Sequence, residues 1–261
     1  MTINKEIYRW IRVISLSLVI FHLSISTVRA QVGEYRNDFA VGGGGGVTLT
    51  TVNFLPKVPQ DMYQGRLFGV TMRYTGEKYF KSICSVVAEA NFAQVGWKES
   101  ILDINDEPVM RIDADERERY ERQLTYFQVP VFARLGWGRE RRGFQFFFQV
   151  GPQIGFLQSE KTKMNFVLEQ RNSEKRTSQV IAQDTMAVEH SFDYGIAGGV
   201  GLEFSHPKVG HFLLEGRYYY GLGNLYGNSK RDYFAISNMQ SIIIKLSYLF
   251  DITRTKNSKI K

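Results

Sequence analysis

From residue 31 onward, apolar and polar residues alternate with a period of two, and this pattern constrains the fold more than any other feature. Such alternation is typical of a β-strand whose two faces meet different environments. In the clearest run, residues 144–156, the even positions are apolar, whereas most odd positions are glutamine or glycine. Residues 212–222 and 242–250 repeat the pattern. Since helical periodicity is almost absent here, the sequence predicts an all-β protein.

Eight segments show the alternation, at about residues 38–49, 66–75, 83–98, 122–137, 143–159, 190–204, 211–222 and 236–250. The connections between them alternate between long (50–65, 99–121, 160–189, 223–235) and short (76–82, 138–142, 205–210). An even number of antiparallel strands suits closure into a barrel, and outer-membrane barrels have long loops outside and short turns in the periplasm. We therefore predict an eight-stranded antiparallel up-and-down transmembrane β-barrel.

The strand face opposite the apolar one carries eight charged residues of balanced sign: Arg73, Glu89, Arg134, Asp193, Glu203, Glu215, Arg217 and Lys245. Eight charges inside a small soluble core would be very costly. Inside a hydrated lumen they can pair and form hydrogen bonds, while the apolar face meets lipid. We therefore predict a lumen charge network made by these residues, inside a barrel too narrow for a wide channel.

In a membrane-spanning barrel, aromatic residues near the strand ends form two girdles at the membrane–water interfaces. The sequence places five of them there: Trp97, Trp137, Tyr126, Tyr220 and Phe250. The strands have 10 to 17 residues, and about 9–11 residues are enough for a tilted strand to cross a bilayer.

Residues 1–30 have the pattern of a secretory signal peptide. Basic residues at the start precede an apolar run over residues 13–25, and small residues before Gln31 suit cleavage after Ala30. That run is too short to cross a bilayer as a helix. We therefore divide the chain into a signal peptide (1–30), an outer-membrane β-barrel (31–250) and a basic C-terminal tail (251–261).

The net charge of +7 is concentrated at the two ends of the chain. Residues 1–30 and residues 251–261 each carry +3, which leaves +1 for the barrel. A nucleic-acid-binding protein would concentrate basic residues on a folded face. The charge distribution therefore predicts no nucleic-acid partner.

Four stretches carry a resemblance to a known family, together with Gly42–Gly46: residues 126–132 (YFQVPVF), 151–157 (GPQIGFL), 193–203 (DYGIAGGVGLE) and 218–224 (YYYGLGN). With them the chain resembles the PorT-like, or porin-family, outer-membrane β-barrel proteins of Bacteroidetes-type bacteria. The resemblance implies a barrel in the outer membrane of a Gram-negative bacterium, in contact with its lipid. Most members lack an assigned role, and one branch is linked to protein secretion. The basic tail after Phe250 departs from barrels that end on a terminal aromatic residue.

No motif predicts catalysis, a cofactor or a metal. The glycines of Gly42–Gly46 would need a following helix to cradle a phosphate, but residues 47–51 continue a strand. They instead leave room for bulky lumen residues and permit curvature. His206 and His211 flank a short turn without further metal donors, so we interpret them as surface residues. The lone Cys84 excludes an intrachain disulfide.

Three functions remain open for such a barrel. The first is a non-enzymatic barrel with a closed polar lumen, acting as a structural or partner-binding protein, or as an accessory of protein secretion. The second is a small-solute porin. The third is a lipid-modifying enzyme, which would need a Ser or Asp/His group at the outer leaflet. There, His190 points away from the face that Ser191 and Asp193 share.

The long connection 160–189 is the predicted contact surface for a secretion or surface protein partner. It is rich in polar residues, with only Phe166, Val167 and Leu168 as a short apolar run. We therefore expect it to be exposed and mobile. The charged turn Arg139–Arg142 would lie at the opposite end, where it could touch lipid phosphates.

Overall fold

A computed structural model describes residues 33–227 and 232–256 of the chain. Of the described residues, those from Tyr35 onward belong to one compact unit. The predicted signal peptide, residues 1–30, lies outside the described residues, as does the end of the basic tail beyond residue 256. None of the described helical segments has the length and hydropathy that a membrane-crossing helix needs.

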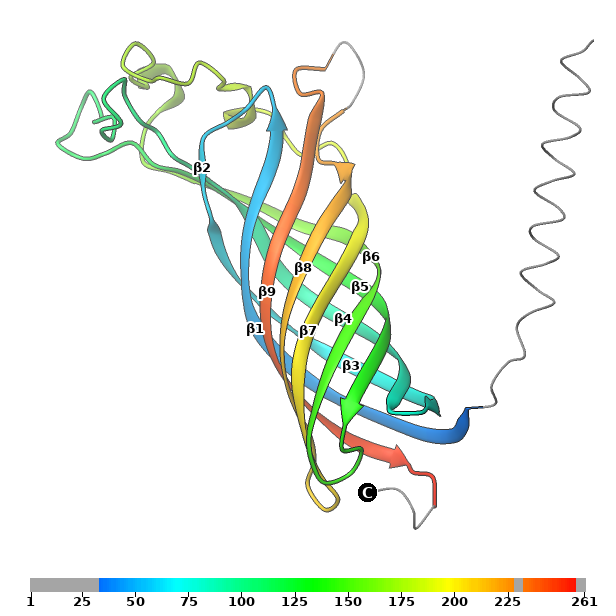
Figure 1. Ribbon diagram of the computed structural model, residues 1–261. Coiled ribbons are helices and arrows are strands. Elements are labelled where there is room, and N and C mark those ends of the chain that lie inside the picture. Colours follow the sequence, from blue (N-terminus) through cyan, green and yellow to red (C-terminus); the bar gives the residue numbers. More distant parts are fainter. Residues whose placement is uncertain (1–32, 228–231, 257–261) are drawn as a thin grey trace, which may run out of the picture. The chain divides into compact units, whose positions relative to one another are not determined.

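Eight long antiparallel strands form the unit (Figure 1). They are β1 (Glu34–Leu55), β3 (Tyr63–Tyr79), β4 (Ser82–Glu99), β5 (Tyr120–Gly138), β6 (Gly143–Met164), β7 (Phe192–His206), β8 (Gly210–Asn224) and β9 (Ile236–Thr253). A two-residue strand, β2 (Gln60–Asp61), pairs with the end of β4. The helical segments are two single turns, η1 (Leu168–Gln170) and η2 (Ala182–Asp184).

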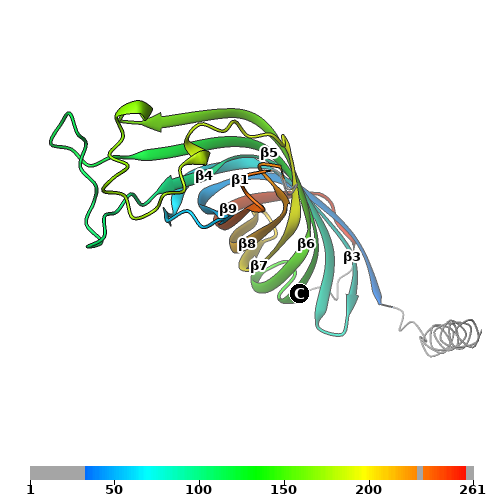
Figure 2. The same cartoon turned by 90° about the horizontal axis from the view of Figure 1, so that it is seen from above.

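The strands close into a ring, which Figure 2 shows from above. Each long strand from β3 to β9 pairs with the next, β9 pairs with β1, and β1 neighbours β3. The seam between the first and last strands is long, running from Ala40 opposite Asp251 to Leu55 opposite Ile236. A closed ring leaves no unpaired edge. The predicted eight-stranded barrel is therefore confirmed.

An apolar belt covers the outside of the barrel, as the alternation predicts. On β6 the exposed side chains from Phe144 to Phe156 belong to it. Toward the long loops the outward positions become polar, with Gln123 on β5 opposite Lys161 on β6. The strands therefore continue beyond the apolar belt at the long-loop end, which explains why they are longer than predicted.

Two of the five expected girdle aromatics lie inside the barrel instead. Trp97 and Tyr126 are both 0% exposed, whereas Trp137, Tyr220 and Phe250 face outward. The prediction was wrong for this pair because a residue's position along the strand shows only which end of the barrel it is near. Whether its side chain points into or out of the barrel depends on odd or even position in the strand. Trp97 has the parity of the inward-facing Glu89 on β4.

The glycines of β1 lie where the backbones of β1 and β9 approach closely. A Cβ atom on Gly42 would lie 1.8 Å from the Tyr248 carbonyl oxygen, and one on Gly46 would lie 2.1 Å from that of Ile244. Since β1 continues through this stretch without a helix, the glycines serve the seam rather than a phosphate.

Candidate functional site

The short-turn half of the barrel interior is filled by a charged core, defined here as Arg73, Glu89, Arg134, Glu203, Glu215, Arg217 and Lys245. These side chains come from β3, β4, β5, β7, β8 and β9, and all are buried. Each strand contributes them at inward positions, so the barrel wall itself brings the charges together. They are seven of the eight residues expected in a lumen charge network.

Glu89 is the carboxylate on which two cations converge. The Arg217 guanidinium lies 3.0 Å and the Lys245 ammonium 2.9 Å from its two oxygens. Arg217 also pairs with Glu215, and its guanidinium lies 4.4 Å from the centre of the Phe132 ring. This part of the core therefore ties β4, β8 and β9 to one another across the interior.

Arg134 and Arg73 extend the core toward the short turns. Arg134 donates to Gln149 at 2.8 Å and lies 3.9 Å over the Phe147 ring, with Glu203 at 3.6 Å. Arg73 pairs with the same carboxylate, 2.6 Å from Glu203. All of these cations are thus paired with carboxylates, and Arg134 and Arg217 are also stacked on aromatic faces.

Asp193, the eighth expected residue, lies apart from the charged core. The Tyr219 hydroxyl donates to its carboxylate at 2.6 Å. Within the described ranges no ion pair reaches this carboxylate. The shared inward parity placed Asp193 inside the barrel but says nothing of how far along the axis it lies.

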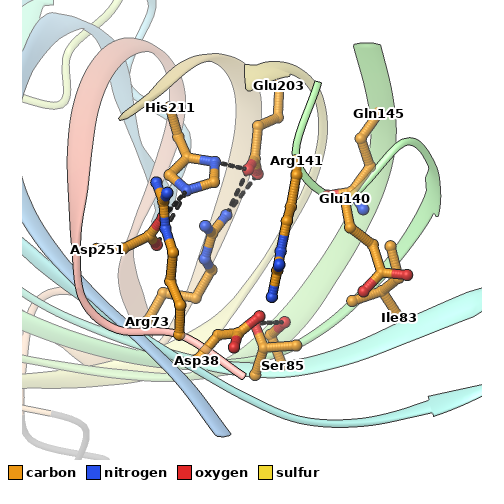
Figure 3. Close-up of a pocket in the computed structure, with 12 residues that line it drawn as sticks. Asp38, Arg73, Ile83, Ser85, Glu140, Arg141, Gln145, Glu203, His211 and Asp251 are labelled. Atoms are coloured by element: carbon orange, nitrogen blue, oxygen red, sulfur yellow. Dashed lines mark hydrogen bonds and ion pairs between the residues drawn. The ribbon is translucent and has the colours of Figure 1, made fainter. Parts of the chain in front are cut away.

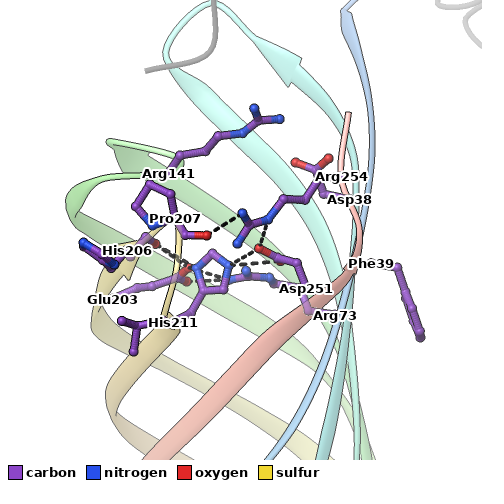
Figure 4. Close-up of polar contacts among 12 residues, drawn as sticks. Asp38, Phe39, Arg73, Arg141, Glu203, His206, Pro207, His211, Asp251 and Arg254 are labelled. Atoms are coloured by element: carbon purple, nitrogen blue, oxygen red, sulfur yellow. Dashed lines mark hydrogen bonds and ion pairs between the residues drawn. The ribbon is translucent and has the colours of Figure 1, made fainter. Parts of the chain in front are cut away.

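His211 extends the charged core to the short-turn end, where the sequence suggested a surface histidine (Figure 4). Only 6% of it is exposed. Its Nδ1 lies 2.8 Å from a Glu203 oxygen and its Nε2 3.0 Å from Asp251. The surface interpretation was wrong for His211 because the residue has the inward parity of Glu215 on β8. This shared parity was the sequence feature that could have placed His211 inside the barrel.

Ser205, His211 and Asp251 superficially resemble a nucleophile, base and acid. The Ser205 hydroxyl lies 2.8 Å from His211 Nδ1, but Ser205 is fully buried and the same nitrogen faces Glu203. Since each ring nitrogen faces a carboxylate, both donate hydrogen bonds. His211 therefore has no free nitrogen with which to accept a proton, as a base must.

The turn between β5 and β6 folds over the short-turn end. Glu140 lies 2.9 Å from Arg36 Nε and 2.7 Å from Lys78 Nζ, and Arg141 donates to the Thr255 carbonyl. Burial raises the pKa of Glu140, but the hydrogen bonds from Arg36 and Lys78 outweigh it and hold that pKa below its usual value. Glu140 and Arg141 are therefore bound to other residues of the barrel, whereas the sequence suggested that this turn could touch lipid phosphates.

The space left at this end is small (Figure 3). A cavity of about 30 Å³ lies among Arg73, Arg141, Glu203, His211 and Asp251. One water needs roughly 10–15 Å³ by the same kind of measure, so the cavity has room for one or two.

The long-loop half of the interior is filled differently, by an aromatic plug: Phe54, Trp97, Tyr120, Tyr126, Tyr226 and Phe234. The ring centre of Phe54 lies 5.4 Å from that of Trp97 and 4.8 Å from that of Phe234, and every member is buried. Arg122 crosses it, donating to the Tyr226 hydroxyl at 2.9 Å. The prediction of a polar lumen is therefore wrong for this half. Above the apolar belt, water lies outside the barrel, so apolar side chains gain by turning inward.

The connection 160–189 packs over the plug, whereas the sequence suggested an exposed and mobile segment. Phe166 is buried against the plug, and Val180 and Met186 pack beside it. Polar contacts hold the segment as well: the Tyr120 hydroxyl donates to the Gln183 carbonyl, and the Gln183 amide donates to Glu99 at 2.7 Å. Side chains from the barrel end thus complete a core that the segment lacks by itself.

No group of three or more His, Cys, Asp or Glu side chains in the described part of the chain is arranged to hold a metal ion.

Comparison with known proteins places this architecture. Residues 29–227 match a family model described as an outer membrane protein beta-barrel domain. No curated protein matches the chain.

Among solved structures, the chain is similar to Ail, the attachment invasion locus protein of Yersinia pestis. The two are 12% identical with a TM-score of 0.34, over 83% of this chain and 99% of that one. Neisserial surface protein A is 8% identical with a TM-score of 0.38, over 81% and 97% of the two chains. OprG from Pseudomonas aeruginosa is 13% identical with a TM-score of 0.35, over 84% and 98%.

Proposed function

Because the chain belongs to the outer membrane protein beta-barrel domain family, we propose that it is a non-enzymatic barrel with a closed lumen that binds a partner through its long loops. The family places the protein in the outer membrane of a Gram-negative bacterium, surrounded by lipid. The short turns then face the periplasm and the long loops face outward.

The observation that carries the proposal is that side chains fill the interior along its length. The charged core occupies the periplasmic half and the aromatic plug occupies the extracellular half. The Glu140 turn then lies over the periplasmic mouth and residues 160–189 over the other. An eight-stranded barrel is just wide enough for side chains to fill. With the lumen filled, the long outer loops are the surface that remains for binding a partner.

Planar-bilayer recording of the refolded protein tests the closed lumen. We expect no stable large conductance steps, because the ion pairs of the charged core would have to break for a solute to pass. Reproducible nanosiemens channels would instead support the alternative of a small-solute porin.

The finer proposal is a role as an accessory of protein secretion, and the resemblance to PorT-like proteins supports it. Purification of the intact barrel from native membranes, with identification of co-purifying proteins, tests for a secretion or surface partner. Loss of secreted proteins from the medium of a deletion strain would support the role. Unchanged secretion would reject the role in secretion, and a structural or surface-binding role would then be the remaining proposal.

The alternative of a lipid-modifying enzyme finds little support in the geometry at the outer rim. Asp193 is bound by Tyr219 inside the barrel, whereas His190 is exposed and donates its backbone N–H to Leu225. His211, at the periplasmic end, is held between two carboxylates. In residues 33–227 and 232–256 the His190 ring makes no hydrogen bond or ion pair, and both ring nitrogens of His211 already face carboxylates.

A further inference from the structure

A cavity of about 160 Å³ lies in the extracellular head, outside the aromatic plug. Apolar side chains from three separate segments line it: Val58 after β1, Ile101 and Leu102 after β4, and Val180 from the 160–189 connection. Glu99 and Arg176 are its buried charged residues. A dry apolar cavity of roughly 150 Å³ is large enough to hold a benzene ring. The head therefore contains a preformed space for a small apolar group beside charge.

The Arg176 guanidinium is already neutralised. It donates to Glu118 at 2.8 and 3.0 Å, lies 3.7 Å from Asp184, and stacks 5.0 Å from the Phe166 ring centre. A cation with these partners has little to gain from an anionic ligand, which would meet both carboxylates as well.

Glu99 is the group that lacks a counter-charge. Its partners are the neutral amide of Gln183, at 2.7 Å, and the carboxyl group of Asp184, with which it shares a hydrogen bond. In residues 33–227 and 232–256 no Arg, Lys or His lies within ion-pair distance of it. Gln183 is fully buried and its Oε1 has no hydrogen-bond donor. The wall behind Glu99 thus carries an excess of acceptors, which is an environment that favours a cationic donor.

The protonation of Glu99 points the same way. Burial, together with the nearby Asp184 carboxylate, raises the pKa of Glu99 to about 8. Glu99 lies at the end of β4, beyond Phe92, the last exposed apolar side chain of that strand. Its carboxyl therefore holds a proton at neutral pH, and an arriving cation would displace it.

From the cavity and the Glu99 carboxyl, which among the described residues has a second carboxyl group but no cation beside it, we propose that the extracellular head binds a small organic cation, a primary ammonium carrying one apolar group of about phenyl size. The apolar group occupies the space between Val58, Leu102 and Val180, and the ammonium donates to Glu99. This site is independent of the partner-binding role proposed above, since it needs only the folded head.

Calorimetric titration of the refolded protein with 2-phenylethylammonium tests the proposal, with the heats of empty micelles subtracted. We expect millimolar or tighter binding, and binding of the neutral 2-phenylethanol weaker by about tenfold. Repeating the titration in buffers of different ionisation enthalpy should show that cation binding at pH 7 releases a proton, because the raised pKa of Glu99 leaves its carboxyl protonated before the cation arrives.

Two variants and a matched control locate the site. Glu99→Gln should abolish cation binding and proton release, and Val180→Phe should fill the cavity and abolish binding of both compounds. Glu121→Gln, on the outward face of β5, should bind like the parent protein. Equal binding of cation and alcohol, preferred binding of 3-phenylpropionate, retained binding by Glu99→Gln, or no binding at all would each overturn the proposal.

Discussion

Glu89→Gln is the substitution that most directly tests whether the charged core holds the barrel together. The change keeps the volume of the side chain and removes one charge. Arg217 retains Glu215, but among the described residues the fully buried Lys245 loses its only carboxylate within ion-pair distance and keeps neutral acceptors, the Thr71 hydroxyl at 3.1 Å and the introduced amide oxygen. Removing one partner of a buried ion pair costs about 3–5 kcal/mol, because the other charge stays buried and uncompensated.

A second substitution separates this cause from simple damage to packing. Lys245→Met replaces the stranded ammonium by an apolar side chain of similar length. Added to Glu89→Gln, it should recover much of the loss, with a coupling energy of about 1–3 kcal/mol in a double-mutant cycle. Glu121→Gln, which removes an exposed pair with Lys163, is the matched control and should change stability by about 0.5 kcal/mol or less.

Urea unfolding in micelles, followed by tryptophan fluorescence, measures these differences. Trp97 reports on the aromatic plug and Trp137 on the outer surface near the short turns. The reasoning is refuted if Glu89→Gln costs less than about 1 kcal/mol, or if Lys245→Met deepens the loss instead of reversing it.

Three further predictions follow from other parts of the molecule. Gly46→Ala should prevent closure of the β1–β9 seam and abolish the compact form seen in unheated SDS gels, whereas Gly216→Ala, whose Cβ would meet nothing within 4 Å, should fold normally; two equally compact variants would show that the seam tolerates a side chain. Glu140→Gln should destabilise the protein near neutral pH, and since the folded pKa of Glu140 is lowered, its difference from the parent protein should shrink as the pH falls through that pKa; a difference that stays constant down to low pH would contradict this. Trypsin added to whole cells should cut at the exposed Lys161, Lys163 or Lys175 while the turns at 138–142 and 205–210 stay intact; cleavage only after permeabilisation of the outer membrane would mean that the barrel is inverted.

The barrel could be predicted from the sequence because it depends on a local property. Alternation decides which face of a strand each residue occupies, whatever the neighbouring strands do. The same parity assigns Glu89 and Arg217 to the interior, and it equally assigns His211 and Trp97. Loop lengths similarly fix which end carries the long connections.

Which inward residues meet each other is decided only by the tertiary structure. Arg73 and Glu203 are 130 residues apart, and their contact depends on strand tilt and on the stagger accumulated around the ring. Stagger also separates Asp193 from the charges that share its face. Likewise, Phe166 and Val180 cannot form a core by themselves. They become part of one because Trp97 and Tyr120, from distant strands, belong to the same cluster. The hydrophobic effect acts on surfaces assembled from distant segments, so the plug exists only once the barrel has closed.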